Sequence, residues 1–120
     1  HWFCKNYKKY NDKEENCVVD QHFLLSMIAP RPIYIASASK DLWADPRGEF
    51  LSLSAVEPVY KLYGYNWNNE GKEKIKKMPQ PDEPILGRMS YHLRSGKHDI
   101  TPYDWARYLD FVDFNLKKEK

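Results

Sequence analysis

The sequence lacks a membrane-spanning segment and contains very little cysteine. Its most apolar run, FLLSMIAP, is far shorter than the roughly 20 apolar residues that a transmembrane helix needs, so we expect no membrane partner. The only cysteines, Cys4 and Cys17, form no CxxC pair, and no histidines stand at zinc-finger spacing. These absences argue against a structural metal. They leave two alternatives for the cysteines, a disulfide or two separate thiols.

Neither sign of charge dominates the sequence. The 120 residues include 19 Lys and Arg and 17 Asp and Glu, which gives a formal net charge of +2. Basic residues gather only in KEKIKKM (72–78) and in the final KKEK, both typical of solvated surface, so we expect no nucleic-acid partner. With 42% hydrophobic residues, the chain has a globular composition and the length of one domain.

Short β-rich segments alternate with helical segments along the chain. IYIASAS (33–39) and the strand within GRMSYHLRSG (87–96) are typical of buried strands in a parallel sheet. A helix capped by Asp20 precedes the first strand, and a helix follows each strand, so the order predicts the α/β class with crossover helices. Residues 65–86, rich in Asn, Gly and Pro, predict a long surface loop. Two strands cannot form a complete sheet, so we expect residues 1–120 to be the C-terminal part of a larger α/β domain, incomplete on its own.

A cap residue followed by proline marks both helices that come after the strands. Asp45 precedes Pro46, and Thr101 precedes Pro102, with Asp104 completing a pattern like a capping box. In the first helix we expect Phe50, Leu51 and Leu53 to face inward. In the second, Tyr108 and Phe111 widen an apolar stripe whose residues are Trp105, Leu109, Val112 and Leu116.

Polar residues that could perform chemistry follow both predicted strands. Asp41, Trp43 and Asp45 come after the first strand, and His98 and Asp99 come after the second. In open α/β sheets the working groups lie on loops at the carboxyl ends of the strands. An acid after one strand and a histidine after the next is the chain order of the last two members of a nucleophile–acid–base triad.

Each of these residues also has a structural alternative. Asp45 has a sufficient role as a helix cap, which makes Asp41 the favoured acid. Asp99 is a weaker candidate and is explained as a turn residue, because adjacent side chains on an extended loop tend to point apart. Among the other histidines, we expect His22 to be a satisfied core residue and His92 to be structural.

Trp43 is a large ring in a polar loop. It could pack over the start of the following helix, or it could form a wall of the substrate site, since tryptophan offers a flat apolar face and one N–H donor. The sequence leaves both alternatives open.

A resemblance to a known family lies in two segments, DQHFLLSMIAPRPIYIASASKDLWADPRGEF and GKHDITPYDWARYLDF. Through them the sequence resembles the glucuronoyl esterases, a carbohydrate-esterase family on the α/β-hydrolase fold. The runs IAPRP, DLWADP and KHDITPYDW are specific only in combination. The resemblance implies a serine esterase that hydrolyses the ester between 4-O-methyl-glucuronic acid on xylan and lignin alcohols. It implies no metal and no organic cofactor, a carbohydrate ester as substrate, and a secreted or periplasmic protein.

The resemblance also implies roles for single residues. His98 matches the catalytic histidine, Asp41 the acid position after the penultimate strand, and Trp43 a tryptophan that contacts the uronic acid. Some members use an acid placed earlier in the chain, so Asp41 is either the triad acid or an auxiliary carboxylate.

The sequence contains no G-x-S-x-G-like elbow, where this family places its nucleophile. We therefore expect the upstream N-terminal portion of the same α/β-hydrolase domain to supply the serine and the oxyanion-hole donors. The 120 residues alone should be inactive, because removing a triad member costs several orders of magnitude in rate. Two alternatives remain, a non-catalytic carbohydrate-binding or interaction fragment, and a fragment that associates with itself through an exposed sheet edge.

Overall fold

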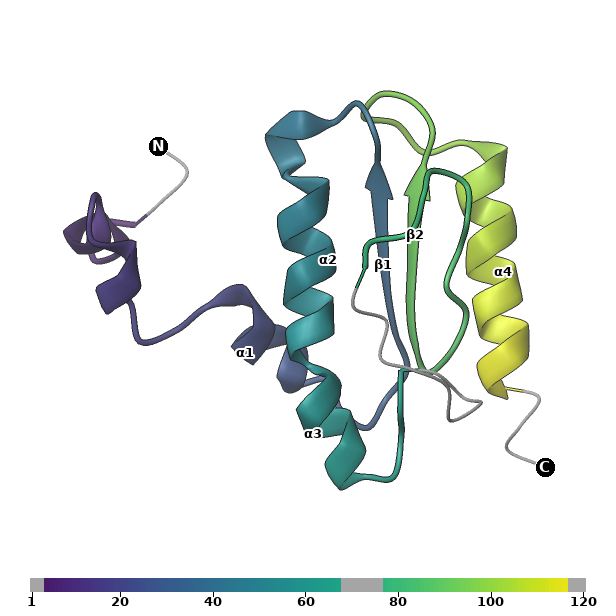
Figure 1. The fold of residues 1–120 in the computed structure, drawn as a ribbon, viewed down its shortest axis with the longest axis horizontal. Helices are drawn as coiled ribbons and strands as arrows, with labels where there is room; N and C mark the ends of the chain where they lie inside the picture. The colour runs from purple at the N-terminus through teal and green to yellow at the C-terminus, as the bar shows by residue number, and fades with distance from the viewer. Residues whose placement is uncertain (1–3, 68–76, 117–120) are drawn as a thin grey trace.

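Two strands lie side by side at the centre of the computed structural model, which describes residues 4–67 and 77–116 (Figure 1). β1 (Ile33–Ala38) and β2 (Met89–Arg94) are parallel and pair along their whole length. β-Branched and aromatic side chains favour this extended backbone. Parallel strands need a long crossover connection, and helices supply it here. The predicted α/β class is confirmed.

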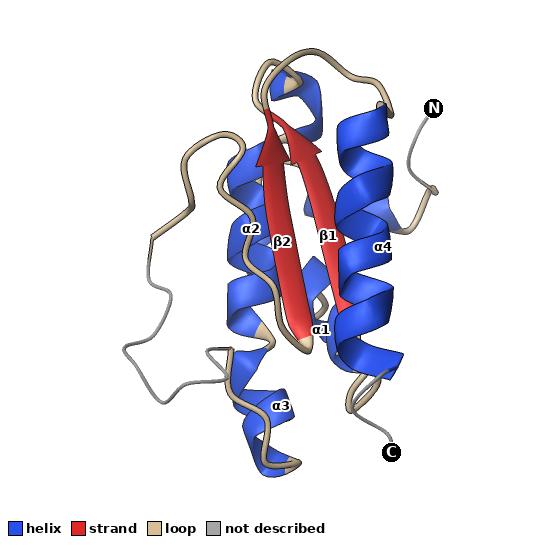
Figure 2. Cartoon of the chain, turned by 90° about the vertical axis from the view of Figure 1, so that its right-hand side faces the viewer, coloured by secondary structure: helices blue, strands red, loops and turns tan. Residues whose placement is uncertain are grey.

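Helices cover both faces of the sheet and give the molecule three layers (Figures 1 and 2). α2 (Pro46–Ala55) and α3 (Glu57–Leu62) lie on one face, and α4 (Pro102–Leu116) lies on the other. α1 (Gln21–Ser26) packs beside α2. The described residues also form short 3-10 helices at Tyr7–Tyr10, Glu14–Asn16 and Leu42–Ala44.

The predicted helix starts are present, and each depends on a side chain that accepts from a backbone amide. Asp20 accepts a 2.7 Å hydrogen bond from the first amide of α1, and Asp45 accepts a 3.1 Å bond from an amide in the first turn of α2. Asp104 accepts a 2.6 Å bond from the backbone amide of Thr101, which closes the capping box of α4. These amides have no partner inside the helix, so the caps define where the helices begin.

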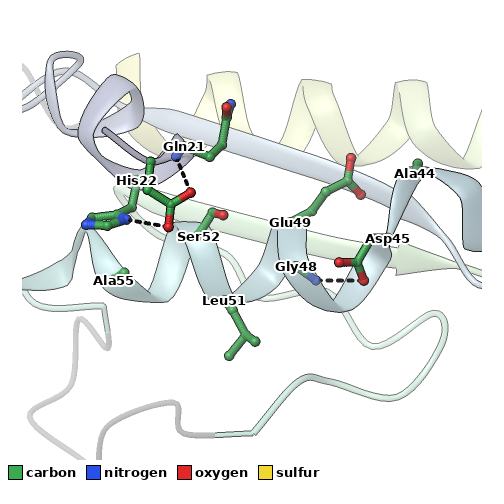
Figure 3. Close-up of a pocket in the computed structure, with 10 residues that line it drawn as sticks. Gln21, His22, Ala44, Asp45, Gly48, Glu49, Leu51, Ser52 and Ala55 are labelled. Carbon is green, nitrogen blue, oxygen red and sulfur yellow. Dashed lines mark hydrogen bonds and ion pairs between the residues drawn. The ribbon is translucent and has the colours of Figure 1, made fainter. Parts of the chain in front are cut away.

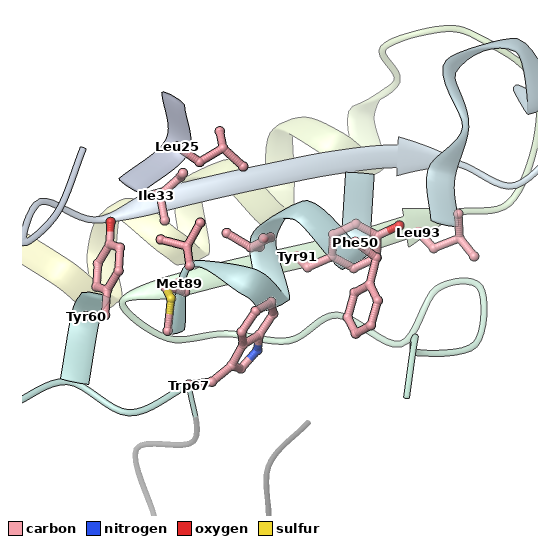
Figure 4. Packing of buried hydrophobic residues seen from close by; sticks show 10 residues of the cluster. Leu25, Ile33, Phe50, Tyr60, Trp67, Met89, Tyr91 and Leu93 are labelled. Atoms are coloured by element: carbon pink, nitrogen blue, oxygen red, sulfur yellow. The ribbon is translucent and has the colours of Figure 1, made fainter. Parts of the chain in front are cut away.

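The apolar core lies between the sheet and the α2–α3 layer (Figure 4). Phe50 and Leu53 are buried as predicted, but Leu51 is 51% exposed, so its predicted inward position was wrong. One residue along a helix turns the side chain by about 100°, which carries Leu51 off the buried stripe. The other core members are Leu25, Ile33, Val56, Tyr60, Trp67, Met89, Tyr91 and Leu93.

The contact between α4 and the sheet is aromatic and polar rather than aliphatic. The Tyr34 ring makes edge contacts with Tyr108 and Phe111, with ring centroids 5.4 and 5.1 Å apart. The predicted apolar stripe of α4 turns away from the sheet. Its four exposed members are Trp105, Leu109, Val112 and Leu116. α4 therefore has an apolar surface that the described part of the chain does not cover.

α1 buries only part of its apolar surface. Leu25 reaches the core, while three other apolar side chains of this region, Phe23, Leu24 and Met27, are exposed. The prediction of a core histidine at His22 was wrong. Its ring is 30% exposed and lies 3.5 Å from the Asp20 carboxylate.

The two edges of the sheet differ. Beside β2, Ile85 runs antiparallel and exchanges two backbone hydrogen bonds with Tyr91, of 2.8 and 3.0 Å. Among the described residues β1 pairs with no strand except β2, so the exposed sheet edge is that of β1. In the predicted 65–86 loop, residues 68–76 lie outside the described residues, and Trp67 just before them is buried in the core.

Candidate active site

The loops that follow β1 and β2 lie together at the carboxyl edge of the sheet (Figure 1). The amide of Ser39 donates to the carbonyl of Arg94 and that of Lys40 donates to the carbonyl of Gly96, both at 2.8 Å. The Gly96 amide in turn donates to Oγ of Ser39 at 3.1 Å. Gly96 has a φ of +125°, which a residue without Cβ adopts readily. These bonds hold the two loops against each other.

This arrangement brings His98 and Asp41 into direct contact across 57 positions of sequence. Nδ1 of His98 lies 2.5 Å from Oδ2 of Asp41. An ionised carboxylate can only accept, so Nδ1 carries the proton of a neutral imidazole and Nε2 holds the free lone pair. The His98 side chain is 88% exposed, so this lone pair is open to a reacting group.

The pKa of His98 is raised above its ordinary value. The hydrogen bond to Asp41 is the main cause, followed by the negative charge of Asp41; desolvation acts in the opposite direction, and the charge of Asp99 adds the smallest effect. Each favourable contact stabilises the imidazolium form. The pair can therefore accept a proton at Nε2 and hold the resulting positive charge beside a carboxylate.

The backbone of Asp41 is held in a short turn. Its amide donates to the Ala38 carbonyl at 3.0 Å, and its own carbonyl accepts from Ala44 at 3.1 Å. Asp45 caps α2 and Asp99 accepts from the next amide in its loop at 2.8 Å, so both take the structural roles considered for them. Of the three aspartates, Asp41 alone contacts His98 in the described part of the chain.

A second carboxylate near Asp41 was not predicted from the sequence. Glu49 on α2 is half-buried and accepts a 2.6 Å hydrogen bond from Oγ of Ser37. Burial raises the pKa of Glu49, the Ser37 bond partly offsets this effect, and the charges of Asp41 and Asp45 add to it. No sequence signal separates Glu49 from an ordinary acidic residue in the first turn of a helix.

Trp43 lies on the 3-10 helix between Asp41 and Asp45 and is 90% exposed. This exposure excludes the alternative in which the ring packs over the start of α2. The exposed side chains of Leu42 and Ile100 belong to the same two loops. The loops therefore present apolar surface around a polar pair, as a site for an amphipathic ligand requires.

A cavity of about 550 Å³ opens beside the pair. Its walls include Asp41 and His98 from the two loops, Glu49 from α2, and Arg94 at the end of β2. The outer edge of β1 also contributes to it, through Ala36 and its neighbours. The cavity therefore connects the candidate site with the uncovered edge of the sheet.

A larger cavity of about 750 Å³ lies between α1 and α2 (Figure 3). Its walls include the Asp20–His22 pair and the cap of α2. None of the candidate site residues Asp41, Trp43 and His98 lines it. The polar contacts on its walls begin helices, so we do not place the site there.

The sequence profile described as "Glucuronyl esterase, fungi" matches residues 1–64, which is more than half of the chain. The chain belongs to the glucuronoyl esterase family. Carbohydrate esterase MZ0003, from an unknown prokaryotic organism, is 44% identical to it over 116 residues, which is 97% of this chain and 26% of the relative. The 4-O-methyl-glucuronoyl methylesterase 1 of Wolfiporia cocos is 30% identical over 63 residues, 52% of this chain and 15% of that protein.

Solved glucuronoyl esterases share the fold of this segment. The structure of the glucuronoyl esterase from Solibacter usitatus matches with a TM-score of 0.78 and 46% identity, over 94% of this chain and 28% of that one. The chain thus spans about a quarter of the length of the relatives that it matches. The described α/β layers correspond to part of a larger esterase fold.

A buried polar network that was not predicted from the sequence lies next to the candidate site of this glucuronoyl esterase segment. Arg94 is 6% exposed, and its Nε lies 2.9 Å from Oδ2 of Asp104. Nε2 of the fully buried His92 donates to the other oxygen of Asp104 at 2.9 Å, and the Tyr34 hydroxyl donates to Nδ1 at 2.7 Å. Burial lowers the pKa of His92, which agrees with a neutral ring between these partners. One feature of the sequence could have indicated this network, namely an arginine in a strand predicted to be buried, because a buried charge is rarely unpaired.

Other chemistries find no support in the described residues. No group of three or more His, Cys, Asp and Glu side chains is placed to hold a metal ion there. Cys4 and Cys17 are both free thiols, so the disulfide alternative is not observed. No described helix is long and apolar enough to cross a bilayer.

Proposed function

We propose that this chain supplies the base and the acid of a serine esterase that hydrolyses glucuronoyl esters. The observation that carries the proposal is the contact between Nδ1 of His98 and Asp41, which leaves Nε2 exposed. The names of the relatives, a carbohydrate esterase and a 4-O-methyl-glucuronoyl methylesterase, support esters of glucuronic acid as the substrate class. Lignin alcohols esterified to xylan-bound glucuronic acid are the natural form that we propose. Such polymers favour a secreted or periplasmic enzyme.

In the proposed reaction, His98 moves one proton at each step. Nε2 takes the hydroxyl proton of the serine as its oxygen attacks the ester carbonyl, and then gives it to the departing alkoxide, which leaves as an alcohol. In the second half, Nε2 takes a proton from water that attacks the acyl-enzyme, and returns it to the serine as the acid departs. Asp41 remains ionised and stabilises the imidazolium.

The remaining parts of the site would come from the rest of the domain. The sequence contains no serine elbow, and the edge of β1 is free to pair with a further strand. We propose that an upstream portion of the same domain pairs there, or lies beside it, and places the serine near Nε2 of His98. Trp43, exposed next to Asp41, would contact the uronic acid.

The proposal is tested by replacing His98 in the intact esterase that contains this segment. The substrate is a methyl ester of 4-O-methyl-glucuronic acid, and the assay follows release of the free acid. His98→Ala should reduce kcat by about 10⁴-fold or more without unfolding the protein, since the side chain is exposed. The matched control is His22→Ala, because His22 lies on α1 and does not line the cavity beside Asp41. Retained turnover in His98→Ala would contradict the proposal, and sugar binding without turnover in the unmodified protein would favour the non-catalytic alternative.

A further inference from the structure

We infer that Arg94 is a positioning residue for His98, because its guanidinium holds the loop that carries the imidazole. The inference rests on the proposed function, since it assigns Arg94 a role only through His98 as the base. Arg94 itself has no place in the proton transfer.

The guanidinium binds the backbone on both sides of His98. Nη2 donates to the carbonyls of Lys97 and Asp99, each at 2.8 Å, and Nη1 donates to the carbonyl of Ser95 at 3.0 Å. Lys97 and Asp99 are the immediate neighbours of His98 in the chain. A planar guanidinium with donors in a fixed fork suits three carbonyls that surround it. The loop is therefore wrapped around one charged group.

The Arg94 guanidinium is itself held by the carboxylate of Asp104. Its Nε contacts Asp104, whose carboxylate also accepts from the amide and the hydroxyl of Thr101, at 2.6 and 2.8 Å. His92 adds a fourth donor to Asp104 at 2.9 Å. Arg94 and His92 belong to β2 and Asp104 belongs to α4, so the His98 loop is tied to the sheet and the helix as well as to the loop that follows β1.

Gly96 shows how closely the loop approaches the guanidinium. A Cβ at this position would lie 2.8 Å from Nη1 of Arg94, and the φ of +125° is one that other residues rarely adopt. The close wrapping therefore depends on the glycine as well as on the arginine.

The hydrogen bonds from Arg94 to this loop matter because the His98 side chain itself makes few contacts. Its side chain is 88% exposed, and in the described part of the chain its hydrogen bond goes to Asp41. A free loop would have to be ordered at each turnover, at a cost in conformational entropy. A displacement of about 1 Å between reacting groups can cost roughly a hundredfold in rate. Arg94 would remove this cost by ordering the loop in advance.

The test uses Arg94→Lys and Gly96→Ala in the intact esterase, with the 4-O-methyl-glucuronate methyl ester as substrate. Lysine keeps the charge beside Asp104 but cannot bind three carbonyls at once. Gly96→Ala keeps both charges of the Arg94–Asp104 pair, but its Cβ would lie 2.8 Å from Nη1 of Arg94, which forces the loop and the guanidinium apart. In both variants we expect kcat to fall roughly a hundredfold with KM nearly unchanged. The acidic limb of kcat/KM should move to lower pH, because displacement of the loop weakens the hydrogen bond to Asp41, which is the main cause of the raised pKa of His98; Asp41 and Asp99 are the charged groups that face the ring.

Ile33→Val is the matched control, because it lies at the opposite end of β1 and loses one methylene from the core. It should lower the unfolding temperature and leave kcat and the pH profile unchanged. If it reduced kcat as much as Arg94→Lys, general destabilisation would explain both, and the inference would be overturned.

Two results separate this inference from the proposed function. Unchanged kcat and pH profiles in both loop variants, with His98→Ala inactive, would overturn the role of Arg94 and leave the proposed function standing. Full turnover in His98→Ala would remove the proposed function itself. If Arg94→Lys does not fold, Gly96→Ala decides the question, since it keeps both charges of the buried pair.

Discussion

Asp41 is largely covered, with 14% of its side chain exposed, whereas His98, which it contacts, is 88% exposed. The backbone of Asp41 is held in a short turn, and the His98 ring that its carboxylate contacts is exposed. In the proposed mechanism, this arrangement leaves Nε2 of His98 accessible to a hydroxyl group from another part of the protein.

Replacing Asp41 by Asn should reduce kcat of the intact esterase by about 10³–10⁴-fold, because the amide favours the wrong tautomer of His98. Ester hydrolysis under substrate saturation measures this change. Asp45→Asn is the control, since asparagine still caps α2 and should leave turnover unchanged. A loss far smaller than that of His98→Ala would identify an upstream carboxylate as the triad acid and Asp41 as auxiliary.

The pH dependence of kcat/KM should have an acidic limb above the ordinary histidine value of 6.5, because Asp41 raises the pKa of His98. The imidazole must be neutral to act as a base, so the rate rises as pH increases through this pKa. In Asp41→Asn the limb should move to lower pH. If the pKa of the acidic limb were unchanged in this variant, a group other than His98 paired with Asp41 would determine it.

Replacing Trp43 by Ala should raise KM about tenfold, which corresponds to about 1.4 kcal/mol of lost binding. The free energy of unfolding should change little, because the ring is 90% exposed. Trp43→Phe keeps a flat apolar face and should show a smaller rise. An unchanged KM in the alanine variant would leave Trp43 outside the substrate site.

Asp104→Ala should destabilise the protein by about 3–5 kcal/mol, because it leaves the buried guanidinium of Arg94 without its partner. Denaturant unfolding measures the loss. Burial acts to raise the pKa of Asp104, but hydrogen bonds from Thr101 and His92 and the charge of Arg94 outweigh it and lower this pKa to about 2.

The depressed pKa of Asp104 also predicts the pH range of acid destabilisation. Its contribution to stability is complete above the ordinary aspartate pKa of about 3.9 and is lost as pH falls through about 2. Asp104→Asn should therefore flatten the dependence of unfolding free energy on pH in this window. An equally steep dependence in that variant would assign the acid sensitivity to other carboxylates.

Asp45→Ala should cost about 1 kcal/mol of stability, since it removes the acceptor for an amide in the first turn of α2. Turnover per folded molecule should stay the same, in contrast to Asp41→Asn. Thermal unfolding and kinetics on the same preparation separate the two aspartates. A loss of kcat comparable to that of Asp41→Asn would contradict the assignment of Asp45 as a cap.

The local features of the chain could be predicted because their causes lie within a few residues. Asp20 and Asp45 begin helices by accepting from amides nearby in sequence, and at the start of α4 Asp104 accepts from the amide of Thr101. The strand at 33–38 follows from its β-branched residues and the prolines before it. The order of strands and helices then places Asp41 and His98 at one edge, because parallel strands end on the same side.

Three features could not be predicted because they depend on contacts between elements that are distant in sequence. They are the outward direction of Leu51, the partial exposure of His22 and the hydrogen bonds from Arg94 to the His98 loop. Which face of α1 or α4 is buried depends on the neighbouring layers, and the described residues provide only some of them. The sequence by itself determined the elements, the caps and the pairing of an acid with a histidine, through short-range hydrogen bonding and the geometry of parallel strands. Only the tertiary structure decided that Nδ1 of His98 faces Asp41 and that Arg94 holds the loop. The first position arises from the bonds between the loops after β1 and β2, and the second from the contact between β2 and α4.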